Sequence, residues 1–166
     1  MLTSLPLPPS DIGTFFTLAA MRAMVYAEFL TPAVRLTASE IVAGISGKDG
    51  TEQAYAIRAW IDSHTEFLRD PDGVEMLHGP AWQIDQIRRN GVVRLDCDDV
   101  AMLAAALGKS IGLRARFVIL AFGGAYRHVF TELSPRGGQL AWMDMDVTRD
   151  SQTLPPRVTR AFAKDV

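Results

Sequence analysis

The sequence predicts an α+β fold, a single domain in which N-terminal helices precede a small antiparallel sheet. Apolar residues recur at helical spacing as far as about residue 111. Three runs rich in β-branched and aromatic residues follow this helical part. Short loops that contain glycine or proline join these runs, so neighbouring strands should be antiparallel. With 166 residues, the chain is long enough for one domain with a buried core.

Residues 1–12 contain several prolines and are predicted to form an extended arm. A helical hairpin is expected over residues 13–48. Its first helix, residues 14–29, carries apolar side chains on two sides, so this wide face must be buried in the core or against a partner. Its second helix starts at Thr31-Pro32, which supply a capping hydroxyl and a first-turn proline, and Gly47 can end it.

Residues 50–150 are predicted to form the part of the domain that carries the chemistry. A helix is expected from about residue 52 to residue 68, and residues 70–73 have the composition of a turn. A short helix begins at Pro80 and stops at Asn90-Gly91. The next helix begins at Cys97 with Asp96 as its cap. Its predicted buried stripe consists of Val100, Leu103, Ala104, Leu107 and Ile111.

The predicted strands cover residues 116–122, 126–133 and 140–147. Gly123-Gly124 separates the first two strands, and a turn at residues 135–138 separates the second from the third. We expect the helix that begins at Cys97 to pack on this sheet. Residues 151–166 are basic and interrupted by prolines, and we expect an irregular C-terminal tail there.

Composition excludes several classes of function. The net charge of −2 gives no strong field toward nucleic acid or an anionic membrane. A single cysteine cannot form an internal disulfide or a thiolate metal cluster, and His64, His78 and His128 lack zinc spacing. We therefore expect no metal and no cofactor. The apolar stretch of residues 13–30 contains Arg22 and Glu28, which argues against a membrane span, and no signal peptide is expected.

Cys97 is the residue that points most directly to chemistry. A lone cysteine is more often an inert buried side chain, but this one begins a helix, where free N–H groups and the helix dipole favour a thiolate. Its thiol should face the sheet, where His128 on the second strand can act as a base. The third strand offers Asp144 and Asp146 on one face as partners of the imidazole, and periodicity does not choose between them.

Five segments of the chain together resemble the transglutaminase-like domains of the papain-like cysteine-enzyme superfamily. They are residues 96–99 (Asp-Cys-Asp-Asp), 101–107, 112–118, 128–132 and 142–148. The resemblance implies that Cys97 is the nucleophile, His128 the general base and acid, and Asp146 the carboxylate that orients the imidazole. Two positions depart from the family pattern, where Leu95 replaces a glycine and Val147 a proline.

The family also supplies an oxyanion donor from upstream of the cysteine. Trp82 and Gln83 are the predicted candidates for this donor, and Trp60 is a further one. The expected activity is cysteine-dependent hydrolysis of an amide bond, or acyl transfer, on a peptide or protein substrate.

Residues 67–75 resemble small transglutaminase-like proteins encoded among bacteriophage structural genes. This implies a place in the cytoplasm of the host bacterium or in the virion. The alternative function is that of a catalytically silent structural or assembly protein, which keeps the fold and binds other virion proteins through its N-terminal helices.

Overall fold

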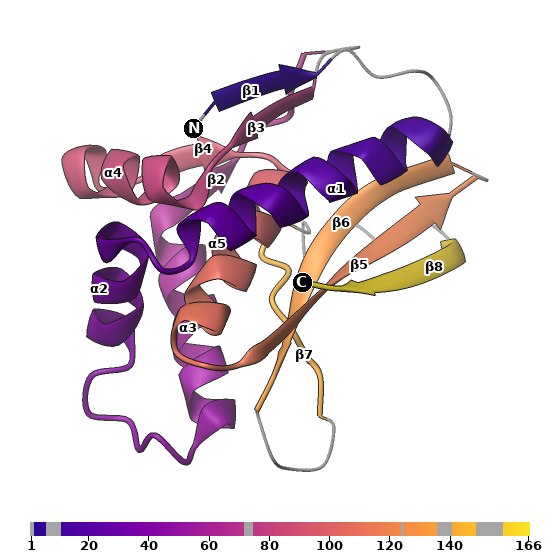
Figure 1. Cartoon of the computed structure of the whole chain (residues 1–166). Helices are drawn as coiled ribbons and strands as arrows, with labels where there is room; N and C mark the ends of the chain where they lie inside the picture. Colours follow the sequence, from indigo (N-terminus) through magenta and orange to yellow (C-terminus); the bar gives the residue numbers. More distant parts are fainter. Residues whose placement is uncertain (1, 6–10, 72–74, 124, 136–140, 149–157) are drawn as a thin grey trace.

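The computed structural model describes residues 2–5, 11–71, 75–123, 125–135, 141–148 and 158–166. It confirms the α+β prediction, because helices form one side of the molecule and a small sheet forms the other (Figure 1). The helices are α1 (Asp11–Glu28), α2 (Pro32–Ile41), α3 (Gly50–His64), α4 (Pro80–Asn90) and α5 (Cys97–Ser110). The strands are β1 (Leu2–Leu5), β2 (Thr65–Phe67), β3 (Glu75–His78), β4 (Val93–Leu95), β5 (Arg114–Phe122), β6 (Ala125–Ser134), β7 (Met143–Asp144) and β8 (Val158–Asp165).

The largest sheet has four strands in the order β7-β6-β5-β8, and all neighbours are antiparallel. This agrees with the short loops that the sequence places between the strands. Two smaller pairs lie outside this sheet: β1 with β3, which is antiparallel, and β2 with β4, which is parallel. The strand β4 leads directly into α5, so the parallel pair lies at the N-terminal end of that helix.

Helix α5 is the centre of the core. Every residue from Asp98 to Gly108 is buried, because α1, α2 and α3 pack around the helix and β5 and β6 close its remaining side. The helix is buried on every side over this span, so the single stripe predicted from spacing is too narrow. Thr131 on β6 donates its hydroxyl to the Ala101 carbonyl oxygen at 2.6 Å, which ties the helix to the sheet.

Helix α1 buries one of its two apolar sides and part of the other, where Met24 is buried. Leu18, Met21 and Val25 are buried as the spacing predicts, whereas Phe16 on the other side is 63% exposed. The last residue of this helix, Glu28, accepts the N–H of Ala81 at 2.8 Å and so caps the first turn of α4.

The predicted helix over residues 52–68 ends earlier than expected, at His64. Thr65 takes an extended backbone conformation and pairs with Val93 as the first residue of β2. Its hydroxyl donates to the Ile61 carbonyl oxygen at 2.9 Å, which satisfies an acceptor left free at the helix end. The strand pairing therefore overrides a helical spacing that continues in the sequence.

The prediction of an irregular tail is wrong for residues 158–165, which form β8. Without β8, the backbone groups along one edge of β5 would lack strand partners, and β8 supplies them by antiparallel pairing. The extended arm predicted over residues 1–12 contains the strand β1 at residues 2–5, and it ends earlier than predicted because α1 already begins at residue 11.

The third predicted strand, residues 140–147, pairs only over Met143–Asp144. Residue 140, most of the predicted turn at 135–138 and Gly124 lie outside the described residues. No helix in the described parts of the chain is long and apolar enough to cross a membrane.

Candidate active site

Cys97 is the first residue of α5, as the sequence predicts. Asp96 caps the helix by accepting the N–H of Asp99 at 3.3 Å. The thiol is half-buried and packs against the hydrophobic core. On its own helix, its polar neighbour is Asp98, whose Oδ1 lies 3.8 Å from the sulfur. The helix N-terminus presents backbone N–H groups and a positive dipole end, which favour an anion at the sulfur.

His128 lies on β6 between the thiol and an acidic side chain. Its Nε2 atom lies 2.6 Å from Oδ2 of Asp146. Burial disfavours the imidazolium, but the hydrogen bonds and charges of Asp146 and Cys97 outweigh this and raise the pKa of His128 to about 9. Because Asp146 occupies Nε2, the ring nitrogen that remains for the thiol is Nδ1.

Asp146 is bonded at both carboxylate oxygens and along its backbone. Thr148 donates its N–H to Oδ1 at 3.0 Å and its hydroxyl to the same oxygen at 2.8 Å. Arg58 on α3 donates to the Asp146 carbonyl oxygen at 3.2 Å. Burial opposes the charge of this carboxylate, yet His128 and Thr148 hold its pKa well below the usual range. The carboxylate is thus oriented toward the imidazole and charged.

Of Asp144 and Asp146, between which periodicity leaves the choice open, Asp146 is the one whose carboxylate contacts the imidazole. Oδ1 of Asp144 accepts the N–H of Asp146 at 2.6 Å, so Asp144 holds the backbone of the residue that contacts the imidazole. Sequence reasoning missed the supporting roles of Thr148 and Arg58. The short Asp-x-Thr spacing could have indicated the role of Thr148. Arg58 is 88 residues from Asp146, so no local pattern in the sequence indicates its role.

Strand β6 is irregular beside His128. Strand alternation places Tyr126 on the same face as His128, but the pairing with β5 shifts register between these two residues. Tyr126 pairs with Ala121 and His128 pairs with Leu120, which are consecutive, so the two side chains lie on opposite faces. Phe130 does share the face of His128, with 6.0 Å between their ring centroids.

A family model described as the transglutaminase-like superfamily matches residues 37–147, which is more than half of the chain. The chain belongs to the transglutaminase-like superfamily. Its fold is therefore that of the papain-like cysteine-enzyme superfamily. The matched residues contain Cys97, His128 and Asp146. Neither the curated proteins nor the solved structures compared with the chain gave a match.

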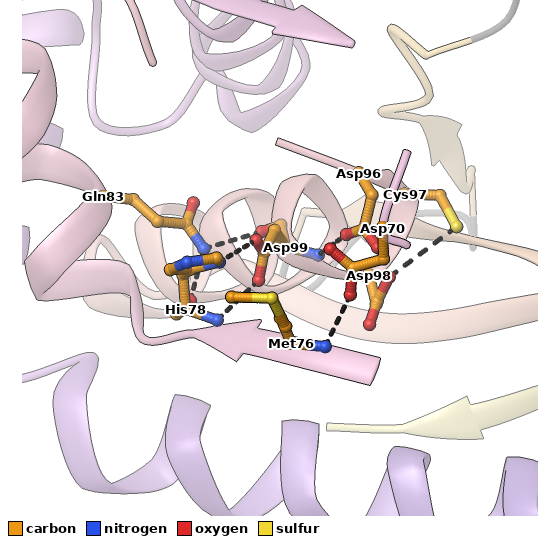
Figure 2. Close-up of polar contacts among 8 residues, drawn as sticks. All are labelled: Asp70, Met76, His78, Gln83, Asp96, Cys97, Asp98 and Asp99. Carbon is orange, nitrogen blue, oxygen red and sulfur yellow. Dashed lines mark hydrogen bonds and ion pairs between the residues drawn. The ribbon is translucent and has the colours of Figure 1, made fainter. Parts of the chain in front are cut away.

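Two predicted oxyanion donors of this transglutaminase-like domain lie in a different cluster. The side-chain nitrogen of Gln83 donates to the His78 carbonyl oxygen at 2.6 Å and to the Asp99 carbonyl oxygen at 3.0 Å, which uses both of its N–H groups. The Trp82 ring stacks on the His78 ring, 4.3 Å between centroids. In Figure 2, the Cys97 sulfur points away from His78 and Gln83, so the Gln83 side chain is not directed at the thiol. Trp60, the further candidate, stacks on His64 at 4.5 Å.

His78 and Asp99 form a second histidine–aspartate pair, which sequence reasoning did not find. Nδ1 of His78 lies 2.6 Å from Oδ2 of Asp99, and the His78 N–H donates to Oδ1 at 2.7 Å (Figure 2). This pair ties β3 to the first turn of α5 on the side away from the thiol. Within the described residues, no group of three or more His, Cys, Asp or Glu side chains could hold a metal ion.

Proposed function

We propose that the protein is a cysteine-dependent amide-bond hydrolase or acyl transferase that uses Cys97, His128 and Asp146. The observation that supports the proposal is the imidazole of His128, whose Nε2 atom lies 2.6 Å from Oδ2 of Asp146 and whose pKa is raised by its neighbours Asp146 and Cys97. This arrangement lets a proton pass between sulfur and imidazole while a carboxylate stabilises the imidazolium.

The first half-reaction follows from these positions. The Cys97 thiolate attacks the carbonyl carbon of the amide and forms a C–S bond, and the carbonyl oxygen becomes an oxyanion. The N–H of Cys97, at the helix N-terminus, is a suitable donor to that oxygen. The C–N bond then breaks as the His128 imidazolium gives its proton to the leaving amine. The product is a thioester on Cys97 with a neutral imidazole beside it.

The second half-reaction decides between hydrolysis and transfer. A water molecule or an amine attacks the thioester, and His128 accepts its proton. The C–S bond breaks, and the products are a carboxylic acid or a new amide together with the regenerated thiolate–imidazolium pair. Both outcomes share one intermediate, so access of the acceptor selects between them. From the phage resemblance of residues 67–75, we propose a phage or host protein as the first substrate to test and a cell-wall peptide as the second.

The experiment measures alkylation of Cys97 by iodoacetamide at pH 7, followed by mass spectrometry of the intact protein. The expected rate in His128→Ala is at least about tenfold below that of the wild type, because the thiolate loses its cationic partner. His64→Ala is the matched control and should leave the rate unchanged, since His64 contacts Trp60 on α3. Equal, slow alkylation of all three proteins would contradict the proposal.

A binding role is the second candidate, and the exposed apolar side chains near the start of α1 favour it. Ile12, Phe15 and Phe16 are each at least half exposed. Under this proposal, α1 binds another virion protein and Cys97 has no catalytic role. A phage that carries Cys97→Ala would then assemble and infect normally, whereas Phe15→Ser and Phe16→Ser together would impair assembly. Normal assembly with both serines would exclude the binding role.

A further inference from the structure

The carboxylate of Asp98 lies beside the nucleophile, on the first turn of α5. Its Oδ1 atom lies 3.8 Å from the Cys97 sulfur, so the thiol can donate a hydrogen bond to it (Figure 2). The residue is 3% exposed, which shields this contact from solvent. The chemistry proposed above gives Asp98 no role, yet a charge at this position must affect the charge of the sulfur.

A thiolate and a carboxylate this close together repel each other. Burial strengthens the repulsion, because little water lies between the charges to screen them. The first charge therefore makes the second more costly, and the two groups titrate as a pair. Two carboxyl groups about 3 Å apart behave in this way and share one proton. We expect the same of Cys97 and Asp98, with one proton held between sulfur and oxygen.

The positive groups at the site offset this repulsion only in part. The imidazolium of His128 is shared with Asp146, whose Oδ2 atom lies 2.6 Å from Nε2. The helix dipole favours an anion at the sulfur, but Asp96 and Asp99 add negative charge at the start of the helix. Burial lowers the pKa of His78, the partner of Asp99, so this histidine adds little positive charge at neutral pH.

We propose that Asp98 is a further catalytic residue, which shares one proton with the Cys97 thiol and so limits the fraction of thiolate at neutral pH. This inference rests on the proposed function and describes how the same site is regulated. In the resting protein, the thiol donates its proton to Oδ1 of Asp98. To form the thiolate, the S–H bond breaks and the proton passes to Nδ1 of His128. The carboxylate then either takes up a proton from water or stays charged beside the thiolate, and both routes cost free energy at neutral pH.

The test is the rate at which iodoacetamide alkylates Cys97 at pH 7. Asp98→Asn keeps the shape of the side chain and removes its charge, so the rate should rise about tenfold as more of the sulfur becomes thiolate. Asp98→Ser also removes the charge and should raise the rate in the same direction, so the test does not depend on the folding of one variant. Asp98→Glu keeps the charge and should stay at or below the wild-type rate.

The pH dependence separates a change of charge from a change of exposure. At about pH 10, where cysteine thiols are largely ionised, the rates of the wild type and of Asp98→Asn should converge. A thiol that is merely more exposed in the variant would be alkylated faster at this pH as well. An acceleration that persists undiminished at pH 10 would overturn the role of Asp98, as would equal rates at pH 7 in the wild type and both neutral variants.

Asp99→Asn is the matched control, because it removes one negative charge from the same helix turn. The Asp99 carboxylate contacts His78 and not the sulfur, so the rate at pH 7 should stay within about twofold of the wild type. An equal acceleration in this variant would show that the contact of Asp98 with the sulfur is not the cause. Failure of the proposed function is distinguishable, because it would appear as a rate that does not fall in His128→Ala.

Discussion

The imidazole of His128 has a charged partner on one side and the thiol on the other, and burial makes both interactions stronger. Its side chain is 15% exposed, and the Asp146 side chain is 2% exposed. A charge-assisted hydrogen bond of 2.6 Å between two buried side chains stabilises the imidazolium more than the same bond would at the protein surface. Asp146 is itself held by Thr148 and Asp144, so the orientation of the imidazole depends on bonds that do not touch the thiol.

The raised pKa of His128 predicts a dependence of stability on pH. The folded protein holds this proton up to about pH 9, whereas a histidine in the unfolded chain loses it near the ordinary pKa of 6.5. The stabilisation is therefore complete below pH 6.5 and is lost as the pH rises to 9, by at most about 3 kcal/mol. Urea unfolding of the wild type between pH 6.5 and 9 should show this decline, and His128→Gln should show a much smaller one. Parallel declines in both proteins would contradict the assignment.

At the scale of elements, α5 and β6 approach each other closely at Gly108. A methyl group added at Gly108 would lie 2.5 Å from Cδ2 of Leu133, which is completely buried. Small side chains along α5, many of them alanine, allow the sheet and three helices to approach it at once. The position of Cys97 relative to His128 depends on this approach, because one residue starts α5 and the other lies on β6.

We expect Gly108→Ala to destabilise the fold, although alanine is the better helix former by about 1 kcal/mol. The overlap with Leu133 should outweigh that gain and leave a net loss of about 1–2 kcal/mol in the free energy of unfolding. Chemical denaturation measures this loss. In a Leu133→Ala background the same change should cost less or become favourable, because the clashing atoms are gone. Equal costs in both backgrounds would show that Leu133 is not the obstacle.

At the scale of the whole molecule, the site is assembled from parts that lie far apart in the sequence. The thiol comes from α5, the imidazole from β6, the carboxylate from the segment after β7, and Arg58 from α3. The second pair, His78 and Asp99, holds β3 against the first turn of α5 across 21 residues. This pair stabilises the helix end that carries the thiol without contacting the thiol.

We expect Asp99→Asn to lower the free energy of unfolding by about 1–3 kcal/mol, because a buried bond to a charged group is lost. Asp85→Asn is the control. It removes an exposed ion pair with Arg89 at 2.9 Å and should cost less than about 0.5 kcal/mol. Urea denaturation of both variants tests the comparison. If Asp99→Asn lowers the free energy of unfolding as little as Asp85→Asn does, the His78–Asp99 pair does not anchor the helix.

Local patterns in the sequence were sufficient for the fold class, most helix starts and the candidate residues Cys97 and His128. The cap at Asp96, the proline at Pro80 and the glycine after α4 act within a few residues, so their effect is visible in the chain itself. The resemblance singled out Asp146, because the family pattern keeps residue order and spacing. Periodicity alone could not single out Asp146, because Asp144 and Asp146 lie on the same face of the third predicted strand.

The tertiary structure decided what depends on pairing between distant segments. It placed Gln83 and Trp82 with His78, and it made a strand of residues 158–165. It also brought Phe67 beside the strand that leads into Cys97. Hydrogen bonds between strands and burial in a shared core act across the chain, and no local spacing records them. The sequence by itself thus determined which residues could form the site, and the packing of α5 on β6 decided how they meet.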